Sequence, residues 1–279
     1  MTPAQVEKTM KKAAQVLKKP GKIDPNLPIK VGVDLGTAFT VIIITDEDGR
    51  PLAAANQFAD VVRDGIVWDF SGAMSVVRSL KEKLEKATGR QLTAGAVTIP
   101  PAVNESDHRA HHYVLEGCGI ECTAVVDEPT AANAVLGMTN GAVVDIGGGT
   151  TGVAILKDGK VVETLDEPSG GTHLSLVISG SLGVSFDEAE QMKRDPANHA
   201  KLMPLVRPTL EKVSTIVKEG IAGKGVERIQ MVGGTCAFTG IEQIMTTVTG
   251  IESTVAPEPM LVTPLGVAAW AQPITGGLE

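Results

Sequence analysis

The residues best suited to chemistry lie in one stretch, residues 143–156, where an apolar run meets an aspartate, three glycines and two threonines. This pattern predicts two antiparallel strands joined by a tight polar hairpin. Glycine leaves backbone N–H groups open to a ligand, and consecutive open amides bind anions. Asp145 could hold Mg²⁺ through water, because Mg²⁺ keeps several of its own waters. The stretch indicates a site for a metal-bound polyphosphate, with a glycine-rich turn that binds nothing as the alternative.

A near-copy of this stretch occurs at residues 30–44, where an apolar strand again meets an aspartate, a glycine and a threonine. Each copy is followed by a second hairpin signal, Asp48-Gly49 in the first half and Asp158-Gly159 in the second. Strand-then-helix segments then recur in both halves, at residues 96–100, 124–136, 229–235 and 254–270. An internal duplication is the economical explanation.

The elements between these segments complete a mixed α/β pattern. Helical spacing predicts further helices at residues 71–88, 103–117, 174–182, 186–194, 202–220 and 240–249. Two similar halves predict two lobes with a cleft between them, the kind of place that ligands favour. We expect an N-terminal helix and linker at residues 1–28, lobe I at 29–138 plus 262–279, and lobe II at 139–261.

The N-terminal helix, expected over residues 3–19, is amphipathic. Val6, Met10, Ala13 and Leu17 share one stripe, and lysines occupy the rest of the surface. The favoured interpretation is a helix packed on the body of the protein. A helix that binds a partner or directs targeting is the alternative.

Composition restricts the class of protein. The formal charge of −8 argues against a nucleic-acid partner, because binding to phosphate backbones rests on clustered Lys and Arg. The three cysteines form no C-x-x-C pair, which fits a reducing cytoplasmic compartment better than a disulfide framework. No apolar run is long enough for a membrane span.

The order of these motifs resembles the actin-like ATPase superfamily, which includes Hsp70 chaperones, sugar kinases and MreB. The resemblance covers residues 31–271. It identifies two phosphate loops, an adenosine loop and two connecting segments, at residues 34–37, 145–150, 232–235, 97–132 and 264–269. It implies a duplicated ribonuclease H-like α/β fold with a nucleotide cleft between two lobes. The outer subdomains are expected to be reduced, because the segments between the motifs are short.

The resemblance also implies ATP or ADP with Mg²⁺ as ligands. Asp34 and Asp145 would meet the metal through water, and Glu128 would orient the attacking water, so that Glu128 and Asp145 are the catalytic candidates. A glutamate stabilised at a helix N-terminus is the alternative for Glu128. Glu190 and Lys193 resemble the helix that contacts adenosine, although an exposed ion pair would also explain them. The implied nucleotide-binding residues are Asp34, Gly36, Thr37, Ala38, Gly147, Gly148, Gly149, Thr150, Thr151, Glu190, Lys193, Gly233, Gly234 and Thr235.

Three departures from the family pattern predict slow or lost hydrolysis. Phe39 stands where a polar residue is usual, Gly152 replaces a common acidic residue, and the Hsp70 active-site lysine has no equivalent. His108 and His112 are four residues apart and could ligate a metal, but we favour a solvated helix face for them.

Within the superfamily, residues 171–174 are Hsp70-like, and residues 63–70 and 189–193 are MreB-like. At this length the combination most resembles a branch of chaperone-like proteins encoded with ethanolamine ammonia-lyase and its microcompartment. The implied function is an ATP-dependent chaperone or reactivating ATPase in the cytoplasm or at a microcompartment. Its protein client would be ethanolamine ammonia-lyase or a microcompartment component. The alternatives are an MreB-like filament or scaffold and a small-molecule kinase, and the sequence leaves the oligomeric state and the client open.

Overall fold

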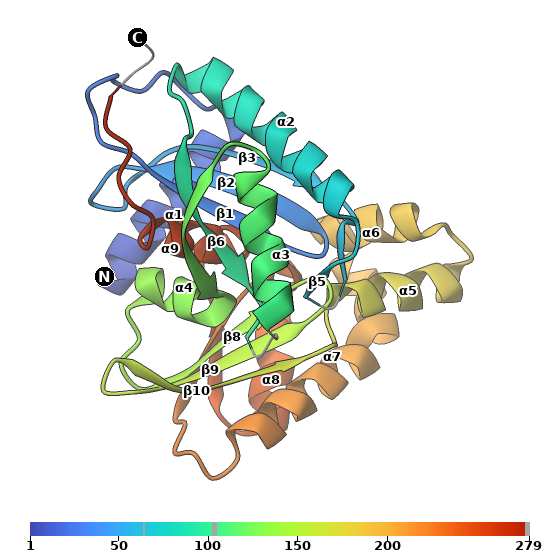
Figure 1. Ribbon diagram of the computed structural model, residues 1–279. Helices are drawn as coiled ribbons and strands as arrows, with labels where there is room; N and C mark the ends of the chain where they lie inside the picture. The colour runs from blue at the N-terminus through green and yellow to red at the C-terminus, as the bar shows by residue number, and fades with distance from the viewer. Residues whose placement is uncertain (64, 102–104, 277–279) are drawn as a thin grey trace. The chain divides into compact units, whose positions relative to one another are not determined.

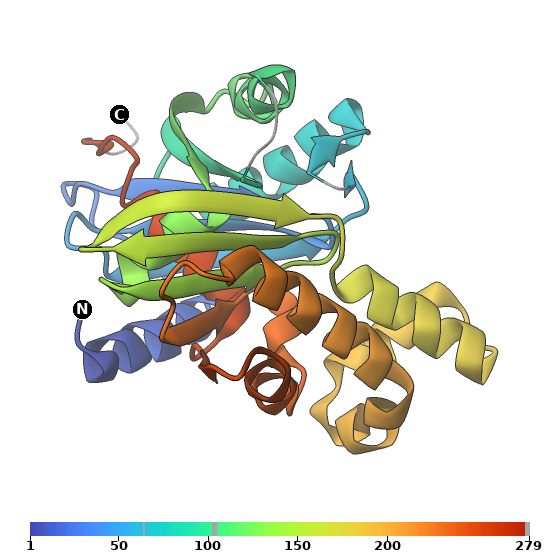
Figure 2. The same ribbon diagram turned by 90° about the horizontal axis from the view of Figure 1, so that it is seen from below.

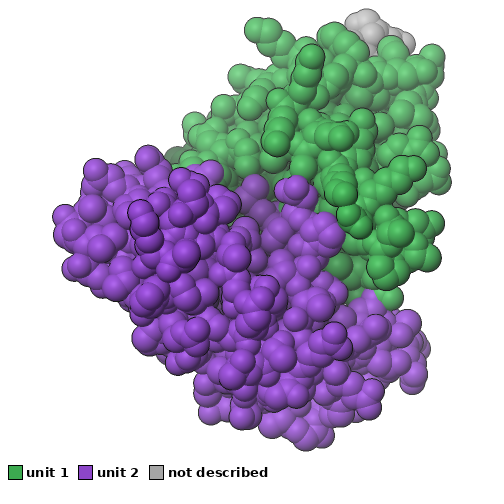
Figure 3. All heavy atoms as spheres, turned by 180° about the vertical axis from the view of Figure 1, so that it is seen from behind, with its two compact units in different colours: residues 1–137, 261–279 green, residues 138–260 purple. Residues whose placement is uncertain are grey.

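The computed structural model describes residues 1–63, 65–101 and 105–276, which form two compact units coloured separately in Figure 3. Unit 1 comprises residues 1–137 and 261–279, and unit 2 comprises residues 138–260. Two predictions fall partly outside the described residues. They are the start of the helix expected at Val103 and Asp64 of the MreB-like segment.

Unit 1 contains a five-stranded sheet with helices on both faces (Figure 1). Its strands are β1 (Lys30–Leu35), β2 (Phe39–Thr45), β3 (Pro51–Phe58), β4 (Val62–Arg63), β5 (Ile66–Val67), β6 (Ala94–Ile99) and β7 (Glu121–Asp127). Its helices are α1 (Pro3–Lys18), α2 (Phe70–Thr88), α3 (Glu105–Glu116), α4 (Glu128–Leu136) and α9 (Val262–Ala268). The strand order is β3-β2-β1-β6-β7, with β4 and β5 forming a separate small sheet.

The core of unit 1 follows from alternation along its strands. Val31, Val33 and Leu35 on β1 face the same side as Ile42 and Ile44 on β2, because successive strand residues point to opposite faces. That side packs against apolar residues of α2 and α3, while α1, α4 and α9 contact the sheet separately. Both faces are therefore covered, which explains why these strands read as nearly continuous apolar runs.

Helix α1 packs on strand β3, as the favoured interpretation of its apolar stripe predicts. The Thr2 hydroxyl oxygen caps the helix by accepting a bond from the N–H of Gln5 at 3.3 Å, and Gln5 Oε1 accepts a bond from the N–H of Thr2 at 2.7 Å. The buried residues are Val6, Met10, Ala13 and Val16. The prediction that Leu17 completes the stripe is wrong by one position, since Val16 is buried there and Leu17 only half-buried.

Unit 2 repeats the sheet of unit 1. Its strands are β8 (Gly141–Ile146), β9 (Thr151–Lys157), β10 (Lys160–Glu167), β11 (Arg228–Val232) and β12 (Glu252–Val255). Its helices are α5 (Gly171–Leu182), α6 (Phe186–Arg194), α7 (His199–Ile221) and α8 (Ile241–Thr249). The order β10-β9-β8-β11-β12 has the same directions as in unit 1, with three antiparallel strands followed by two parallel ones. The predicted duplicated α/β fold is confirmed.

Helices α5 and α6 extend from unit 2 as a pair, while α7 and α8 pack together beside the sheet (Figure 2). None of the helices in the described parts of the chain is long and apolar enough to cross a membrane.

Helices α4 and α9, both in unit 1, approach each other closely. A Cβ on Gly266 of α9 would collide with the carbonyl of Ala131 on α4, so only glycine permits this packing. Every residue of α9 is buried. The two segments that sequence motifs singled out are thus a tightly packed helix pair.

Arg90 ties two irregular segments of unit 1 together from a fully buried position. Its guanidinium donates to the carbonyls of Asp24 at 2.9 Å, Leu27 at 2.5 Å and Ile274 at 3.3 Å. Burial lowers the pKa of Arg90, and the charge of Asp24 opposes this shift. Arg90 anchors the segment after α1 and the segment after α9 to the same point.

We expect Arg90→Met to lower the free energy of unfolding by about 3 kcal/mol, because three carbonyls in a partly buried setting lose a charged donor. Urea denaturation followed by circular dichroism measures this change. The matched control is Arg50→Met, since Arg50 is exposed and lies 3.8 Å from Asp46. Equal stability of the two variants would show that Arg90 does not anchor these segments.

Candidate functional site

The candidate site in unit 2 lies at the carboxyl ends of parallel strands β8 and β11. Asp145 is the penultimate residue of β8 and only 5% exposed, opposite Gly152 on β9 and beside Val232 on β11. Gly233 follows β11 with φ +92°, and a Cβ there would collide with the Asp145 carboxylate. The turn at residues 233–235 therefore passes directly against Asp145.

The loop between β8 and β9 is a closed four-residue turn. The N–H of Gly147 donates to the carbonyl of Thr150 at 3.0 Å. Two loop carbonyls then accept bonds from the start of α5, from the N–H of Gly171 to Gly147 at 2.9 Å and from the N–H of Thr172 to Gly148 at 2.8 Å. The loop is thus docked on the first turn of α5 through its oxygen atoms.

This docking determines where the loop's N–H groups point. In a trans peptide the C=O and N–H bonds point in opposite directions, and no described peptide bond is cis. The N–H groups of Gly148 and Gly149 therefore point away from α5. Neither has an acceptor among the described residues, although Gly149 is buried, and a buried N–H without a partner is rare. The loop presents two adjacent open donors.

Glycines make the docking sterically possible. A Cβ on Gly170 would collide with the carbonyls of Gly147 and Gly148, and a Cβ on Gly171 would collide with the hydroxyl of Thr235. Gly170 has φ −160°, which any residue can adopt. Glycine is therefore needed there because space is limited, and not because of the backbone conformation.

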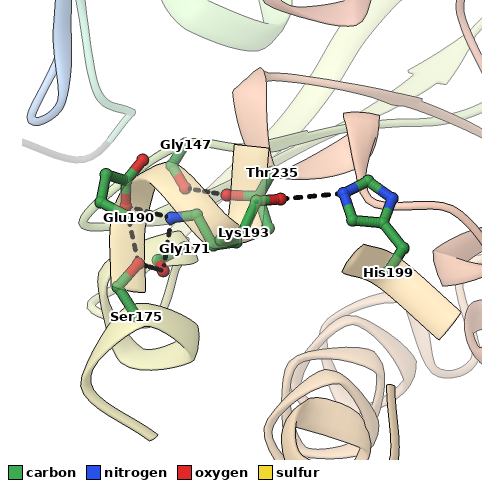
Figure 4. A network of polar contacts seen from close by, with 7 residues as sticks. All are labelled: Gly147, Gly171, Ser175, Glu190, Lys193, His199 and Thr235. Atoms are coloured by element: carbon green, nitrogen blue, oxygen red, sulfur yellow. Dashed lines mark hydrogen bonds and ion pairs between the residues drawn. The ribbon is translucent and has the colours of Figure 1, made fainter. Parts of the chain in front are cut away.

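Glu190 and Lys193 lie against the first turns of α5 (Figure 4). The Lys193 ammonium donates to Glu190 Oε2 at 2.6 Å and to the Gly171 carbonyl at 2.9 Å, and the Ser175 hydroxyl donates to Glu190 Oε2 at 2.6 Å. The two charged side chains are only 11% and 8% exposed, so the interpretation as an exposed ion pair is wrong. Burial lowers the pKa of Lys193, although the charge of Glu190 opposes this shift.

Two predicted ligand threonines use their hydroxyls within unit 2. Thr235 donates to the Gly147 carbonyl at 2.7 Å, which adds a second donor to that oxygen. Thr151 is fully buried and donates to the carbonyl of Ser169 at 2.6 Å. Both hydroxyls therefore donate to backbone carbonyls of unit 2.

His199 fixes the end of α6 from its position at the start of α7. Its Nδ1 accepts the N–H of Thr239 at 3.0 Å, so Nε2 carries the proton and donates to the Lys193 carbonyl at 2.8 Å (Figure 4). The ring stacks on Phe238 with centroids 4.1 Å apart. Neither His199 nor Ser175 was predicted as a site residue, because no local pattern marks either one.

The reactivity of the buried Cys236 thiol is suppressed beside Asp145. Burial raises the pKa of Cys236 well above its ordinary value, and the charge of Asp145 raises it further. The Sγ atom donates to the carbonyl of Val232 at 2.8 Å. Cys236 therefore acts as a packing residue behind the turn.

Unit 1 carries the corresponding loop between β1 and β2. The N–H of Gly36 donates to the carbonyl of Phe39 at 3.0 Å, the same closure as in unit 2. The N–H groups of Thr37 and Ala38 have no acceptor among the described residues, and the carbonyl of Ala38 accepts from Ala59 at 3.2 Å. Each unit thus has an aspartate-ended strand followed by two adjacent open donors.

Asp34 and Glu128 lie at the same carboxyl edge of the unit 1 sheet. Asp34 Oδ1 accepts the hydroxyl of Thr98 at 2.6 Å. Asp127, at the end of β7, caps α4 by accepting the N–H of Thr130 at 2.9 Å, and Glu128 is the first residue of that helix. This placement suits both interpretations of Glu128, because the first helical turn also favours an acidic residue.

Phe39, the first departure from the family pattern, is used in packing. Its ring meets Phe58 edge to face, with centroids 5.5 Å apart, and the two residues are direct partners on β2 and β3. On α3, His112 Nε2 lies 3.9 Å from Glu116. Within the described ranges, no group of three or more His, Cys, Asp or Glu side chains could hold a metal ion directly.

The residues present fit a hydrated metal and a polyphosphate. Open, adjacent N–H groups suit phosphate oxygens, and a carboxylate next to each loop suits the waters of Mg²⁺. The arrangement is repeated in both units, which a single accidental glycine turn would not explain.

Comparison with known families supports the class of protein that the fold defines. The MreB/Mbl family matches residues 57–180, and the cell division protein FtsA family matches residues 142–267. The two sheets of identical topology, each with its aspartate loop, make the chain an actin-like ATPase by fold.

The chain belongs to the family of the ethanolamine utilization protein EutJ. It is 40% identical to EutJ of Escherichia coli over 252 residues, which cover 90% of this chain and 89% of that protein. It is also 25% identical to a chaperone protein HscA homolog of Chromobacterium violaceum. That match covers 78% of this chain but only 44% of the chaperone.

Solved structures agree with this assignment. The crystal structure of EutJ from Carboxydothermus hydrogenoformans matches with a TM-score of 0.90 and 42% identity, covering 97% of this chain and all of that one. MreB5 of Spiroplasma citri bound to AMPPNP matches with a TM-score of 0.68 and 15% identity, covering 87% and 95% of the two chains. The MreB5 likeness shows the fold alone.

We expect Gly170→Ala to lower the free energy of unfolding by about 2 kcal/mol, because its methyl group has no room beside the loop carbonyls. Gly180→Ala on the same helix is the matched control, since no atom lies within 4 Å of its added Cβ. It should raise stability by up to about 1 kcal/mol through helix propensity. Thermal and urea unfolding measure both, and a neutral Gly170→Ala would mean that α5 does not dock on the loop.

Proposed function

We propose that the chain binds ATP and ADP with Mg²⁺ and hydrolyses ATP slowly. The observation that carries this proposal is the repeated loop, in which an aspartate-ended strand leads into a closed turn with two open N–H groups. The phosphates would be contacted by Gly36, Thr37 and Ala38 in unit 1 and by Gly147 to Thr150 in unit 2. The turn at residues 233–235 would receive the adenosine.

Asp34 and Asp145 would hold the hydrated metal. Mg²⁺ bound with ATP would supply positive charge that offsets the charge on the phosphates. Glu128 would orient the attacking water from the first turn of α4, and positioning with electrostatics would contribute most of the catalysis. Slow turnover follows from Gly152, which leaves no side chain opposite Asp145.

Family membership suggests the biological setting. We propose a role in ethanolamine utilisation as a nucleotide-dependent chaperone or reactivating factor for a protein client, with ethanolamine ammonia-lyase or a microcompartment component as candidates. The similarity to an HscA homolog supports the chaperone class. Two units joined in one chain could couple nucleotide state to a client through domain closure.

We expect Asp145→Asn to weaken Mg-ATP binding at least tenfold, about 1.4 kcal/mol, because a carboxylate that holds the metal's waters is lost. Isothermal titration with ATP, in Mg²⁺ and then in EDTA, measures this change. The unmodified protein should lose affinity in EDTA, and Asp145→Asn should be nearly insensitive to it.

The matched control is Asp158→Asn, the same substitution at the exposed turn between β9 and β10. Its affinity for Mg-ATP should equal that of the unmodified protein. Equal affinities for Asp145→Asn and Asp158→Asn would remove Asp145 from the site.

A filament or scaffold protein is the second candidate, favoured by the match of residues 57–180 to the MreB/Mbl family. Sedimentation with and without Mg-ATP separates it from the chaperone. We expect the protein to stay in the supernatant in both conditions at micromolar concentration. Pelleting that depends on ATP would favour the filament and contradict the chaperone.

A further inference from the structure

The ammonium group of Lys193 donates its hydrogen bonds to protein atoms close to the glycine loop. Two of its N–H donors are directed at the Gly171 carbonyl and at Glu190, and the Ser175 hydroxyl holds the same Glu190 oxygen (Figure 4). The backbone of Lys193 is fixed as well, through the bond from His199 to its carbonyl. The position of this buried charge is therefore set by α5, α6 and α7 together.

From Lys193, two peptide groups lead to the open edge of the loop. The peptide between Gly171 and Thr172 accepts from Lys193 at its carbonyl and donates through the Thr172 N–H to the carbonyl of Gly148 at 2.8 Å. The peptide between Gly148 and Gly149 ends in the N–H of Gly149, which has no acceptor among the described residues. Ammonium, two aligned peptides and an open donor form one hydrogen-bonded series.

Such a series transmits polarisation. A donor at a carbonyl oxygen draws electron density toward that oxygen and makes the N–H of the same peptide more positive. Each bond in a chain strengthens the next by roughly 10–30%. A full positive charge at the start has a larger effect than a neutral donor, because charge-assisted bonds are about twice as strong.

We propose that Lys193 is a positioning residue for phosphate, which acts on the N–H of Gly149 through these two peptides. Glu190 and Ser175 hold the ammonium in line with the Gly171 carbonyl. This role rests on the proposed nucleotide binding, and it differs from the adenosine contact that the family resemblance implies for Glu190 and Lys193. The ligand group it serves is the polyphosphate, whatever base is attached.

Lys193→Met tests the proposal with two probes, tripolyphosphate and adenosine, each competed against a fluorescent ATP analogue in Mg²⁺. We expect at least a fivefold loss of affinity for ATP and for tripolyphosphate, with adenosine affinity unchanged within twofold. A direct adenosine contact would instead weaken adenosine and ATP alike and leave tripolyphosphate unaffected.

Ser175→Ala provides a milder variant that keeps both charges and removes a neutral hydroxyl, which lies 2.6 Å from Glu190 Oε2 and 3.3 Å from the Gly171 carbonyl. It should weaken tripolyphosphate by a smaller factor than Lys193→Met and leave adenosine unchanged, and it serves as the test if Lys193→Met does not fold. Lys81→Met is the control, because Lys81 forms a partly buried pair with Glu85 at 2.7 Å in unit 1. It should change neither probe.

The outcomes separate this inference from the proposed function. Failure of the unmodified protein to bind ATP would refute nucleotide binding and the inference with it. ATP binding that is unchanged in both variants, or lost together with adenosine binding, would overturn the positioning role alone.

Discussion

The docking of the glycine loop on the first turn of α5 is the interaction on which the candidate site in unit 2 depends. Two N–H groups of α5 donate to the carbonyls of Gly147 and Gly148. Because each peptide unit is planar and trans, these bonds also fix the direction of the N–H groups of Gly148 and Gly149. Each carbonyl held on one side places an N–H on the other. A helix N-terminus, which ordinarily binds an anion directly, here orients a second set of donors.

The two loops are supported by different bonds, and their sequences differ as well. In unit 2 a helix closes directly on the loop, so glycines are needed on the helix side of the contact, at 170 and 171. In unit 1 the Ala59 N–H, one residue beyond the end of β3, donates to the carbonyl of Ala38, and the loop contains a single glycine at position 36. The two glycines at the start of α5 therefore reflect close packing against the loop.

Much of the fold could be predicted because it depends on local patterns. Helix α6 was expected at residues 186–194 and begins and ends there, since Ser185 and Glu188 form a capping box visible in the sequence. The contacts of Lys193 and Ser175 could not be predicted in this way. An i,i+3 pair such as Glu190 and Lys193 is usually solvent-exposed, and only the approach of α5 buries it. The burial of Arg90 could not be predicted for the same reason, because arginine is rarely buried unless residues from distant segments contact it.

The departures from the family pattern bear on hydrolysis and binding unequally. The proposed phosphate contacts are backbone N–H groups. In unit 2 their orientation depends on the docking at Gly170 and Gly171 and, as we propose, on Lys193, and none of these residues departs from what the loop needs. At Phe39 and Gly152 the chain departs from the family pattern in its side chains. Phe39 packs on Phe58, and Gly152 leaves the position opposite Asp145 without a carboxylate. A chain with intact backbone donors and altered side chains should retain nucleotide affinity more readily than turnover, which suits a protein that responds to nucleotide state more than one that consumes ATP rapidly.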